Sequence, residues 1–314
     1  MKYRSVFVIE SAAGMRLDLY VSTRFPGWSR SAVANAIKEG RIISPSRKMK
    51  PSTLLIANEE LHLYSERYTP STPMPDCPDV VWEDEHAVAF SKPSGMLCHP
   101  VGRKFAWGLI NLARDRYPDL SLHLAHRLDR ETSGVLLMAK NSEMNRHLKR
   151  MFQERRVSKE YLALVRGVIP WDKMLVDGDI QRDMSSPIGM KQGVKAGGQM
   201  AATDIFVEQR LDTRTLVRCK PRTGRTHQIR VHLDHIGFPI VGDKIYGQPP
   251  EVFLSIFEEK PLPNLDELLE HPRHCLHAAT LKFPHMDGTI VTVEAPIPAD
   301  MQEAIASCSK RDEG

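Results

Sequence analysis

A short polar run that stands directly before an apolar run is the stretch of this sequence best suited to chemistry. His126-Arg-Leu-Asp-Arg-Glu-Thr-Ser-Gly134 continues at once into Val135-Leu-Leu-Met-Ala139. Five apolar residues bounded by a glycine and a lysine predict a short buried strand, with the polar run at its mouth. Arg127 and Asp129, two residues apart, would point to the same side of an extended segment. Such a pair can hold a catalytic carboxylate rigidly, but taken alone it favours a structural ion pair that closes a turn.

The elements around this run predict the fold class. A helix capped by Asn141 or Ser142 should follow the buried strand, with an apolar face that contains Met144 and Leu148. Other patterns predict strands within 80–90, 159–167 and 216–220, a hairpin at 281–293, a helix at 226–235, a partly helical 251–270 and a loop-rich 171–200. Strands outnumber helices and no regular alternation of strand and helix occurs. The sequence therefore predicts an α+β fold with a mixed, mainly antiparallel sheet.

The first 64 residues form a separate predicted unit. Ser29 and Ser31 can cap a helix over 32–39, which Gly40 can end in the left-handed conformation. A Pro-Gly turn stands before it at 26–27. Residues 65–79 contain four prolines, which predicts a stiff linker. We therefore expect an N-terminal module at 1–64, a linker at 65–79 and a second domain at 80–314.

Composition limits the possible classes of protein. A chain of 314 residues with 41% hydrophobic and 26% charged residues is long enough for about two domains. It contains no apolar run of membrane-spanning length and no signal-peptide core at its start, so we expect a cytoplasmic protein without a membrane partner. The five scattered cysteines, with no CxxC, predict reduced thiols rather than disulfides or a zinc site.

The net charge of +4 hides a segregation of charge along the chain. Residues 1–64 contain ten Lys and Arg against five acidic residues, and residues 213–233 contain six against none. Residues 251–272 have the opposite balance, with six acidic residues and one lysine. Two basic clusters are typical of a protein that binds a polyanion such as nucleic acid, although solvated basic surfaces would give the same pattern.

Three histidines at positions 271, 274 and 277 raise the hypothesis of a metal site. Pro272 interrupts a regular helix there, and no nearby Cys or Asp completes a ligand set. We therefore predict no metal. His126 would face away from Arg127 and is predicted to be structural rather than a general base.

Several ordered motifs together resemble one family. The signature His-Arg-Leu-Asp-Arg-x-Thr-Ser-Gly is matched at 126–134 without a departure. The matching segments elsewhere are Lys92-Pro-Ser-Gly with His99-Pro100, Lys159-Glu-Tyr161 with Val165-Arg-Gly167, Arg222-Thr-Gly-Arg-Thr-His-Gln-Ile-Arg230-Val-His232, Gly242-Asp-x-x-Tyr246-Gly and His277-Ala278. Residues 80–300 thus resemble the RluA-like RNA pseudouridine synthases. The pattern at 16–41 resembles the S4 RNA-binding domain, from which the chain departs at 44–59.

This resemblance implies an activity and a set of residues. The enzyme would isomerise uridines in structured RNA, breaking the bond from ribose C1′ to uracil N1 and rejoining C1′ to C5, with no cofactor. Asp129 is implied as the catalytic carboxylate, and its addition to C6, attack on C1′ and abstraction of the C2′ proton all remain open. Arg230 would hold that carboxylate ionised. Tyr161 would stack on the uracil, and Arg127 would fill the gap left by the flipped uridine.

The remaining expectations concern RNA and alternatives. Phosphate contacts are expected from two groups of basic residues, namely Lys220, Arg222 and Arg225 in the catalytic domain and Arg30, Lys38 and Arg41 in the module. The target could be large-subunit rRNA or tRNA, and the resemblance implies a monomer. The alternative function is a catalytically silent RNA-binding or ribosome-assembly factor on the same fold.

Overall fold

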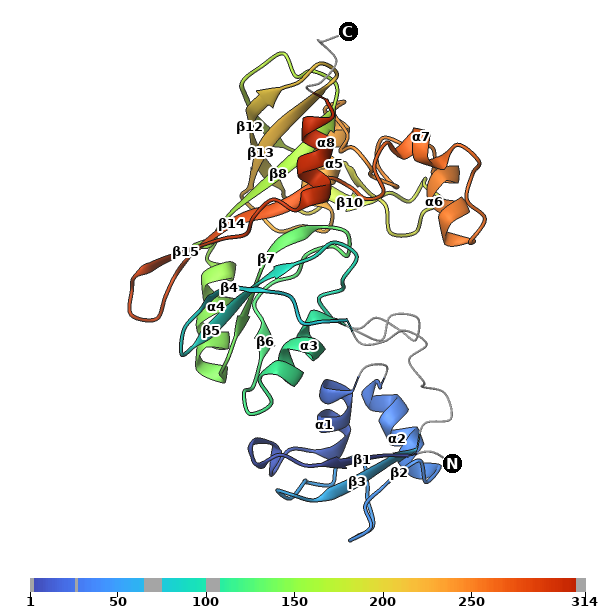
Figure 1. The fold of residues 1–314 in the computed structure, drawn as a ribbon, viewed down its shortest axis with the longest axis vertical. Helices are drawn as coiled ribbons and strands as arrows, with labels where there is room; N and C mark the ends of the chain where they lie inside the picture. The colour runs from blue at the N-terminus through green and yellow to red at the C-terminus, as the bar shows by residue number, and fades with distance from the viewer. Residues whose placement is uncertain (1–2, 26–27, 65–74, 100–107, 309–314) are drawn as a thin grey trace.

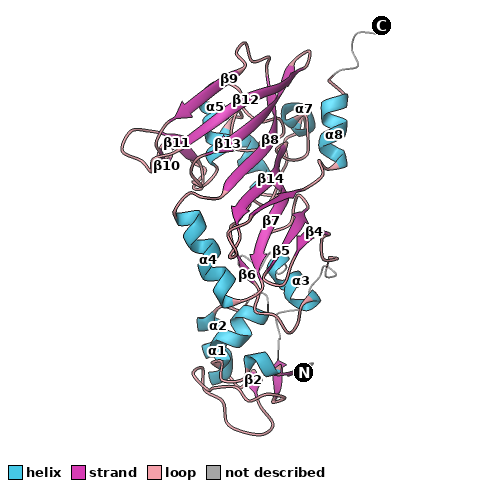
Figure 2. Cartoon of the chain, turned by 90° about the vertical axis from the view of Figure 1, so that its left-hand side faces the viewer, coloured by secondary structure: helices cyan, strands magenta, loops and turns pink. Residues whose placement is uncertain are grey.

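The computed structural model describes residues 3–25, 28–64, 75–99 and 108–308. Its largest feature is a ten-stranded sheet that forms one twisted layer through the upper part of the molecule (Figure 2). A separate three-stranded sheet belongs to the N-terminal residues, which lie at one end of the long axis (Figure 1). The predicted turn at 26–27 and most of the predicted linker, 65–74, lie outside the described residues.

The N-terminal unit packs two helices on a small antiparallel sheet of order β1-β3-β2. Its elements are β1 (Tyr3–Phe7), the 3-10 helix η1 (Glu10–Ala12), α1 (Leu17–Arg24), α2 (Arg30–Lys38), β2 (Ile42–Ile43) and β3 (Glu60–Tyr64). The predicted capping of α2 is confirmed, because Ser29 Oγ accepts a hydrogen bond from the backbone N–H of Ala32 at 3.1 Å and Gly40 has φ +68°. A hydrophobic cluster running from Val8 to Leu63 is the core of this unit.

The large sheet carries the order β4-β5-β7-β14-β8-β13-β12-β9, with β15 paired to β14 and β6 to β7. Its strands are β4 (Val80–Glu83), β5 (Ala87–Lys92), β6 (His123–Leu124), β7 (Ser133–Ala139), β8 (Ser158–Arg166), β9 (Lys173–Asp177), β12 (Ala202–Arg210), β13 (Arg214–Pro221), β14 (Leu276–Pro284) and β15 (Ile290–Glu294). Among the strands of the described residues, only β7 and β14 pair in parallel. The predicted mixed, mainly antiparallel α+β fold is thus confirmed.

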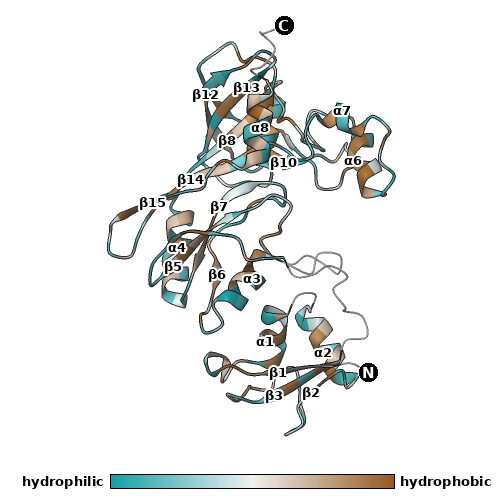
Figure 3. Ribbon diagram, in the orientation of Figure 1, coloured by the Kyte–Doolittle hydropathy of each residue, from teal (hydrophilic) through white to brown (hydrophobic). Residues whose placement is uncertain are grey.

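Helices cover the sheet and frame its edges. They are α3 (Leu109–Arg116), α4 (Ser142–Gln153), α5 (Gln228–His235), α6 (Pro250–Phe257), α7 (Leu265–Leu269) and α8 (Ala299–Ala306). Asn141 caps α4 by accepting from the N–H of Met144 at 2.8 Å, and α4 buries Met144, Leu148 and Met151 as its pattern predicts. The predicted partial helicity of 251–270 is also confirmed; Figure 3 shows the hydrophobic colouring of α6.

The segment 171–200 consists mostly of loops and turns, as predicted, but it also contains short strands that the sequence pattern did not predict. This segment contains β9 and a two-stranded hairpin of β10 (Ile180–Arg182) and β11 (Gln192–Val194). Strands of three to five residues among frequent glycines give no recognisable strand pattern in the sequence. In addition, β9 pairs with β12, which lies more than 20 residues further along the chain. The pairing of β9 with β12 therefore comes from tertiary context rather than from a local pattern.

No helix within the described ranges is both long enough and apolar enough to span a bilayer. All five cysteines fall in those ranges and are free thiols.

Gly134 allows the close approach of the two parallel strands. It has φ +112°, and a Cβ added to it would lie 2.2 Å from the carbonyl oxygen of Ala278 on β14. All seven residues of β7 are buried, so neither strand can move aside freely.

We predict that Gly134→Ala lowers the free energy of unfolding by at least about 3 kcal/mol, because overpacking and backbone strain add. Gly288→Ala is the matched control. Gly288 also has positive φ, +87°, but open space surrounds its added Cβ, so the expected loss is only about 1 kcal/mol. Urea denaturation followed by circular dichroism measures both losses. Equal losses in the two variants would contradict the packing argument.

Candidate active site

Asp129 lies in the loop that leads into β7. Three hydrogen bonds from one lysine tie this loop to the neighbouring turn after β5. The ammonium group of the fully buried Lys92 donates to the carbonyl oxygens of Pro93, Met96 and Arg130 at 2.9, 2.8 and 3.1 Å. Burial lowers the pKa of Lys92 to about 8. The lysine therefore joins the turn after β5 to the residue that follows Asp129, and the carboxylate rests on a rigid support.

Arg230 on α5 contacts two carboxylates at once. Its Nη1 donates to Asp129 Oδ2 at 3.1 Å, while Nε and Nη2 donate to Asp243 at 2.6 and 2.9 Å. Asp243 is 1% exposed and also accepts from the backbone N–H groups of Ile245 and Tyr246. Nε and Nη2 of Arg230 are thus held by a buried ion pair with Asp243, while the third nitrogen, Nη1, donates to Asp129.

These contacts set the ionisation of both carboxylates. Burial is the largest influence on the pKa of Asp129 and acts to raise it. The positive charge and hydrogen bond of Arg230, together with the neighbouring His227 and His274, outweigh burial and hold that pKa below its ordinary value. The same balance holds the pKa of Asp243 far below its usual range. The side chain of Asp129 remains 34% exposed, whereas that of Asp243 is 0% exposed. Asp129 is therefore an ionised carboxylate that a substrate can reach.

His227 and Tyr246 complete the surroundings of Asp129. His227 Nε2 lies 4.0 Å from Asp129 Oδ2, and His227 Nδ1 lies 2.9 Å from the hydroxyl oxygen of Tyr246. The guanidinium of Arg230 lies over the ring of Tyr246, 5.0 Å from its centroid. Tyr246 therefore contacts both neighbours of the carboxylate.

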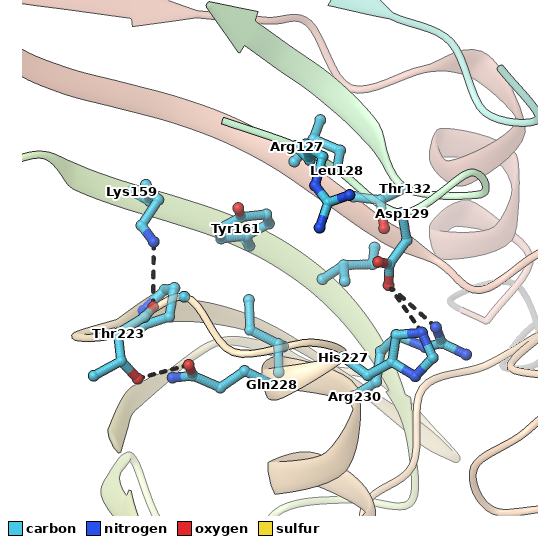
Figure 4. Close-up of a pocket in the computed structure, with 14 residues that line it drawn as sticks. Arg127, Leu128, Asp129, Thr132, Lys159, Tyr161, Thr223, His227, Gln228 and Arg230 are labelled. Atoms are coloured by element: carbon cyan, nitrogen blue, oxygen red, sulfur yellow. Dashed lines mark hydrogen bonds and ion pairs between the residues drawn. The ribbon is translucent and has the colours of Figure 1, made fainter. Parts of the chain in front are cut away.

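One pocket brings together the four residues to which the sequence resemblance assigned roles in the reaction or in flipping the uridine. Asp129, Arg127, Tyr161 and Arg230 all line it (Figure 4). The other lining residues are Leu128, Thr132, Lys159, Pro221, Thr223, Gly224, His227, Gln228, Ile229 and Leu276. Tyr161 comes from β8, in the middle of the sheet, and its ring stands between Lys159 and Asp129 in Figure 4. Burial raises the pKa of Tyr161 well above its usual range, so its phenol stays neutral.

The opening hypothesis of an Arg127–Asp129 ion pair has no support in this geometry. Among the described residues, Arg127 makes no ion pair, and its side chain is exposed at the pocket. Asp129 instead contacts Arg230, which lies 101 positions further along the chain.

The basic residues predicted to contact phosphates are partly engaged by acidic ones. Lys220 pairs with Glu160 at 2.8 Å, Arg222 makes two 2.7 Å hydrogen bonds to Asp204, and Arg225 donates to the carbonyl oxygen of Met200. In the N-terminal unit, Arg30 pairs with Asp18 and Arg41 with Glu39, whereas Lys38 is exposed. Contacts with phosphates would have to compete with these ion pairs.

The three histidines that raised the metal hypothesis, and also His126, have protein partners. His274 Nε2 lies 2.8 Å from Thr132 Oγ1, His277 Nδ1 lies 3.0 Å from Ser133 Oγ, and His271 Nδ1 lies 2.7 Å from the carbonyl oxygen of Arg273. His126 Nε2 accepts from the N–H of Leu137, and burial lowers its pKa to about 3. Within the described ranges no three His, Cys, Asp or Glu side chains are grouped as a metal site.

Sequence reasoning gave no role to Asp243, His227, Tyr246 or Lys92. Asp243 and Tyr246 belong to Gly242-Asp-x-x-Tyr246-Gly, and His227 belongs to the segment that ends at Arg230. These motifs were visible, but a motif does not reveal which side chains meet across the fold.

Comparisons with known proteins find similarity along most of this chain. Residues 86–235 match the family model described as RNA pseudouridylate synthase. The ribosomal large subunit pseudouridine synthase D of Neisseria meningitidis serogroup B is 34% identical, over 94% of this chain and 79% of the relative. The ribosomal large subunit pseudouridine synthase C of Escherichia coli K12 is 32% identical, over 98% and 95%. The solved structure of human RNA pseudouridylate synthase domain containing 1 aligns with a TM-score of 0.55 and 29% identity, over 69% of this chain and 82% of that one.

Asp243→Asn should lower the free energy of unfolding at pH 7 by about 3 kcal/mol, because it breaks a buried ion pair whose arginine keeps only one carboxylate. The folded-state pKa of Asp243 lies below its unfolded value of about 3.9. The stability it contributes is therefore present above about pH 4 and declines as the pH falls below that value. The difference between wild type and variant should shrink accordingly, as urea denaturation at pH 7, 5 and 3.5 would measure.

The control is Asp119→Asn, at an exposed position, with an expected change within about 0.5 kcal/mol. A difference between wild type and Asp243→Asn that stays constant down to pH 3.5 would contradict the assignment.

Proposed function

The chain belongs to the RNA pseudouridylate synthase family and is an RNA pseudouridine synthase, and from this we propose that it isomerises uridines in large-subunit ribosomal RNA with Asp129 as its catalytic carboxylate. One observation carries the assignment of Asp129: it is an ionised, reachable carboxylate in a pocket, held by the otherwise buried Arg230. The names of the relatives carry the choice of RNA, because both bacterial proteins are named as ribosomal large subunit enzymes.

The reaction needs a charged carboxylate next to the ribose. Breaking the bond from C1′ to N1 leaves C1′ electron-poor, and a negative charge within reach stabilises that state. Asp129 can supply it by adding to C6, by attacking C1′ or by removing the C2′ proton. Each route requires the ionised form, which the charge of Arg230 favours. Each route is also compatible with an isomerisation in which no oxygen atom from water enters the product.

The same pocket offers a surface for the base. We assign the ring of Tyr161 to stacking on the target uracil, since it stands beside Asp129 and its phenol stays neutral. We assign Arg127 to the RNA stack from which the uridine is extruded, because its charged side chain is exposed at the pocket. The flipped uridine would then lie between these side chains and α5.

The remaining parts of the proposal concern RNA affinity and context. Residues 1–64 would act as an S4-like RNA-binding module, joined by a linker at 65–79 to the catalytic domain at 80–314. Arg30, Lys38, Arg41, Lys220, Arg222 and Arg225 would contribute salt-sensitive phosphate contacts. A ribosomal substrate places the enzyme in the cytoplasm, and we propose that it works as a monomer.

We predict that Asp129→Asn reduces isomerisation by at least about 10³-fold while the protein stays folded, because the neutral amide cannot stabilise C1′. Release of tritium from RNA labelled at uridine C5 measures turnover, and circular dichroism checks the fold. Turnover by Asp129→Asn close to the wild-type rate would refute the assignment of Asp129.

Mapping pseudouridines in ribosomal and transfer RNA, with and without the gene, tests the choice of RNA. Loss of a tRNA site alone would redirect the proposal to tRNA.

Substitution of Arg230 should change the pH dependence of the reaction. Without its positive charge, burial raises the pKa of Asp129, so the carboxylate becomes protonated at a higher pH. In Arg230→Gln the rate should therefore begin to fall at a higher pH than in wild type as the solution is acidified. Arg230→Lys, which keeps the charge but not the paired N–H donors, is the control and should show a smaller shift. Tritium release between pH 5 and 8 measures all three. Identical pH profiles would contradict the electrostatic role.

A further inference from the structure

His227 lies in the pocket, and the assignments above leave it unused. It stands immediately before α5, with Nε2 directed at the space beside Asp129 (Figure 4). The distance of 4.0 Å from Nε2 to Asp129 Oδ2 is too long for a hydrogen bond. Its side chain is 11% exposed. Nε2 of this partly exposed side chain therefore faces the pocket without a hydrogen bond to the carboxylate next to it.

The backbone of His227 is held in a costly conformation. The residue has φ +58° and ψ +16°, in the left-handed region that residues with a Cβ rarely adopt. It precedes the first turn of α5, yet its side chain makes no capping hydrogen bond to the helix. Capping therefore does not explain a histidine here. Strained residues of this kind are concentrated where a side chain must be aimed at a ligand.

Its hydrogen bonds determine which nitrogen carries the proton. The hydroxyl oxygen of Tyr246 accepts from the N–H of Gln192 at 3.0 Å and lies 2.9 Å from His227 Nδ1. Tyr246 is 1% exposed, and within the described part of the chain its hydroxyl has no other acceptor. If Nδ1 carried a proton, the hydroxyl proton would be left buried and unsatisfied, which costs about 1–3 kcal/mol. Tyr246 therefore donates to Nδ1, and the proton of the neutral ring is on Nε2.

The ring is neutral at the pH of the cell. Burial, followed by the nearby charge of Arg230, lowers the pKa of His227 to about 4, even though Asp129 and Asp243 act in the opposite direction. Nε2–H is thus a hydrogen-bond donor without a full charge. It can polarise an oxygen of the substrate, but it is not a protonated general acid.

We propose that His227 is a catalytic residue that donates a hydrogen bond from Nε2 to O2 of the target uracil. This deepens the function proposed above and depends on it. Asp129 must reach the ribose next to N1, and O2 is the base oxygen nearest to that bond, whereas O4 lies on the far side of the ring. With Asp129 next to C1′, its carboxylate oxygens and O2 of the base would repel each other. A donor located 4.0 Å from the carboxylate offsets that repulsion.

The hydrogen bond from His227 Nε2 to O2 becomes stronger as the bond between C1′ and N1 breaks. The electron pair of the C1′–N1 bond leaves with the uracil and spreads from N1 onto O2, while C1′ becomes electron-poor beside Asp129. His227 keeps its proton and stabilises the charge on O2. C1′ then bonds to C5, C5 releases its proton to water, and N1 takes up a proton from water. Atoms and charge balance without any other reactant, and Tyr246 acts as a positioning residue that fixes the tautomer.

The test compares two substitutions at position 227. Asn adopts the left-handed backbone readily and can still meet Tyr246, but it is too short to place a donor at the position of Nε2. Gln reaches that position with its amide N–H. Single-turnover tritium release is measured on a mixture of large-subunit rRNA and tRNA transcripts labelled at uridine C5, and RNA binding is measured separately. We expect His227→Asn to slow the chemical step about 100-fold with less than a threefold change in RNA affinity. His227→Gln should recover at least tenfold of that loss.

Two further measurements distinguish this donor from other roles. Between pH 5.5 and 8 the pH profiles of wild type and His227→Gln should coincide, because the ring does not titrate there. After the target is mapped, a stem-loop with a single 2-thiouridine at that position replaces O2 by a weak acceptor. This change should slow the chemical step in the wild type. In His227→Asn, whose rate is already reduced, it should lower the rate by less than a further threefold.

The proposal is overturned if His227→Asn reacts within threefold of wild type, or if His227→Gln is as slow as His227→Asn. It is equally overturned if the wild type alone shows a pH transition near 6.5, or if the effects of 2-thiouridine and His227→Asn multiply. Failure of the proposed function would look different, because it appears as absent turnover by the wild type on both RNAs. Failure of the present inference leaves wild-type turnover intact and appears instead in the rates of the variants, in the pH profiles or in the effect of 2-thiouridine.

Discussion

One guanidinium shared by two carboxylates is the interaction on which the site depends. Arg230 is buried, and two of its nitrogens are bound by Asp243, which is buried as well. An isolated charge would be too costly in this position, so the arginine and the aspartate require each other. Because Asp243 takes up two of the three guanidinium nitrogens, the third, Nη1, is free to donate to Asp129. Asp129 is left reachable, ionised and held in place, which is what a reaction at an electron-poor ribose carbon needs.

The large sheet holds the segment that carries Asp129. Asp129 precedes β7, and β7 pairs in parallel with β14. His274 and His277 contact Thr132 and Ser133 across that junction. The histidine spacing that raised a metal hypothesis is thus explained by two hydrogen bonds that fix the segment from Asp129 to β7. The loop that carries Asp129 is therefore held at its end by the strands that it joins.

Sequence reasoning predicted what is local and missed what is long-range. The buried strand after Gly134, the caps Ser29 and Asn141 and the terminal hairpin all follow from short patterns, and the structure has them. Placing Arg230 beside Asp129 required a resemblance to a family, since 101 positions separate the two. The role of Asp243 could not be predicted from the sequence, because the sequence around a loop aspartate does not indicate which cationic side chain it pairs with in the fold. The short strand β9 was hidden for the same reason, since its main partner lies on β12.

The central claim is that Arg230 keeps Asp129 ionised inside the pocket, and the ionisation of this one carboxyl group tests it most directly. The protein can be labelled with carbon-13 at its aspartate carboxyls, and the signal of Asp129 is identified by its absence in Asp129→Asn. A pH titration of that signal should give a pKa below the ordinary value of about 3.9 in wild type. A pKa at or above that value would show that burial outweighs Arg230, and it would contradict the account.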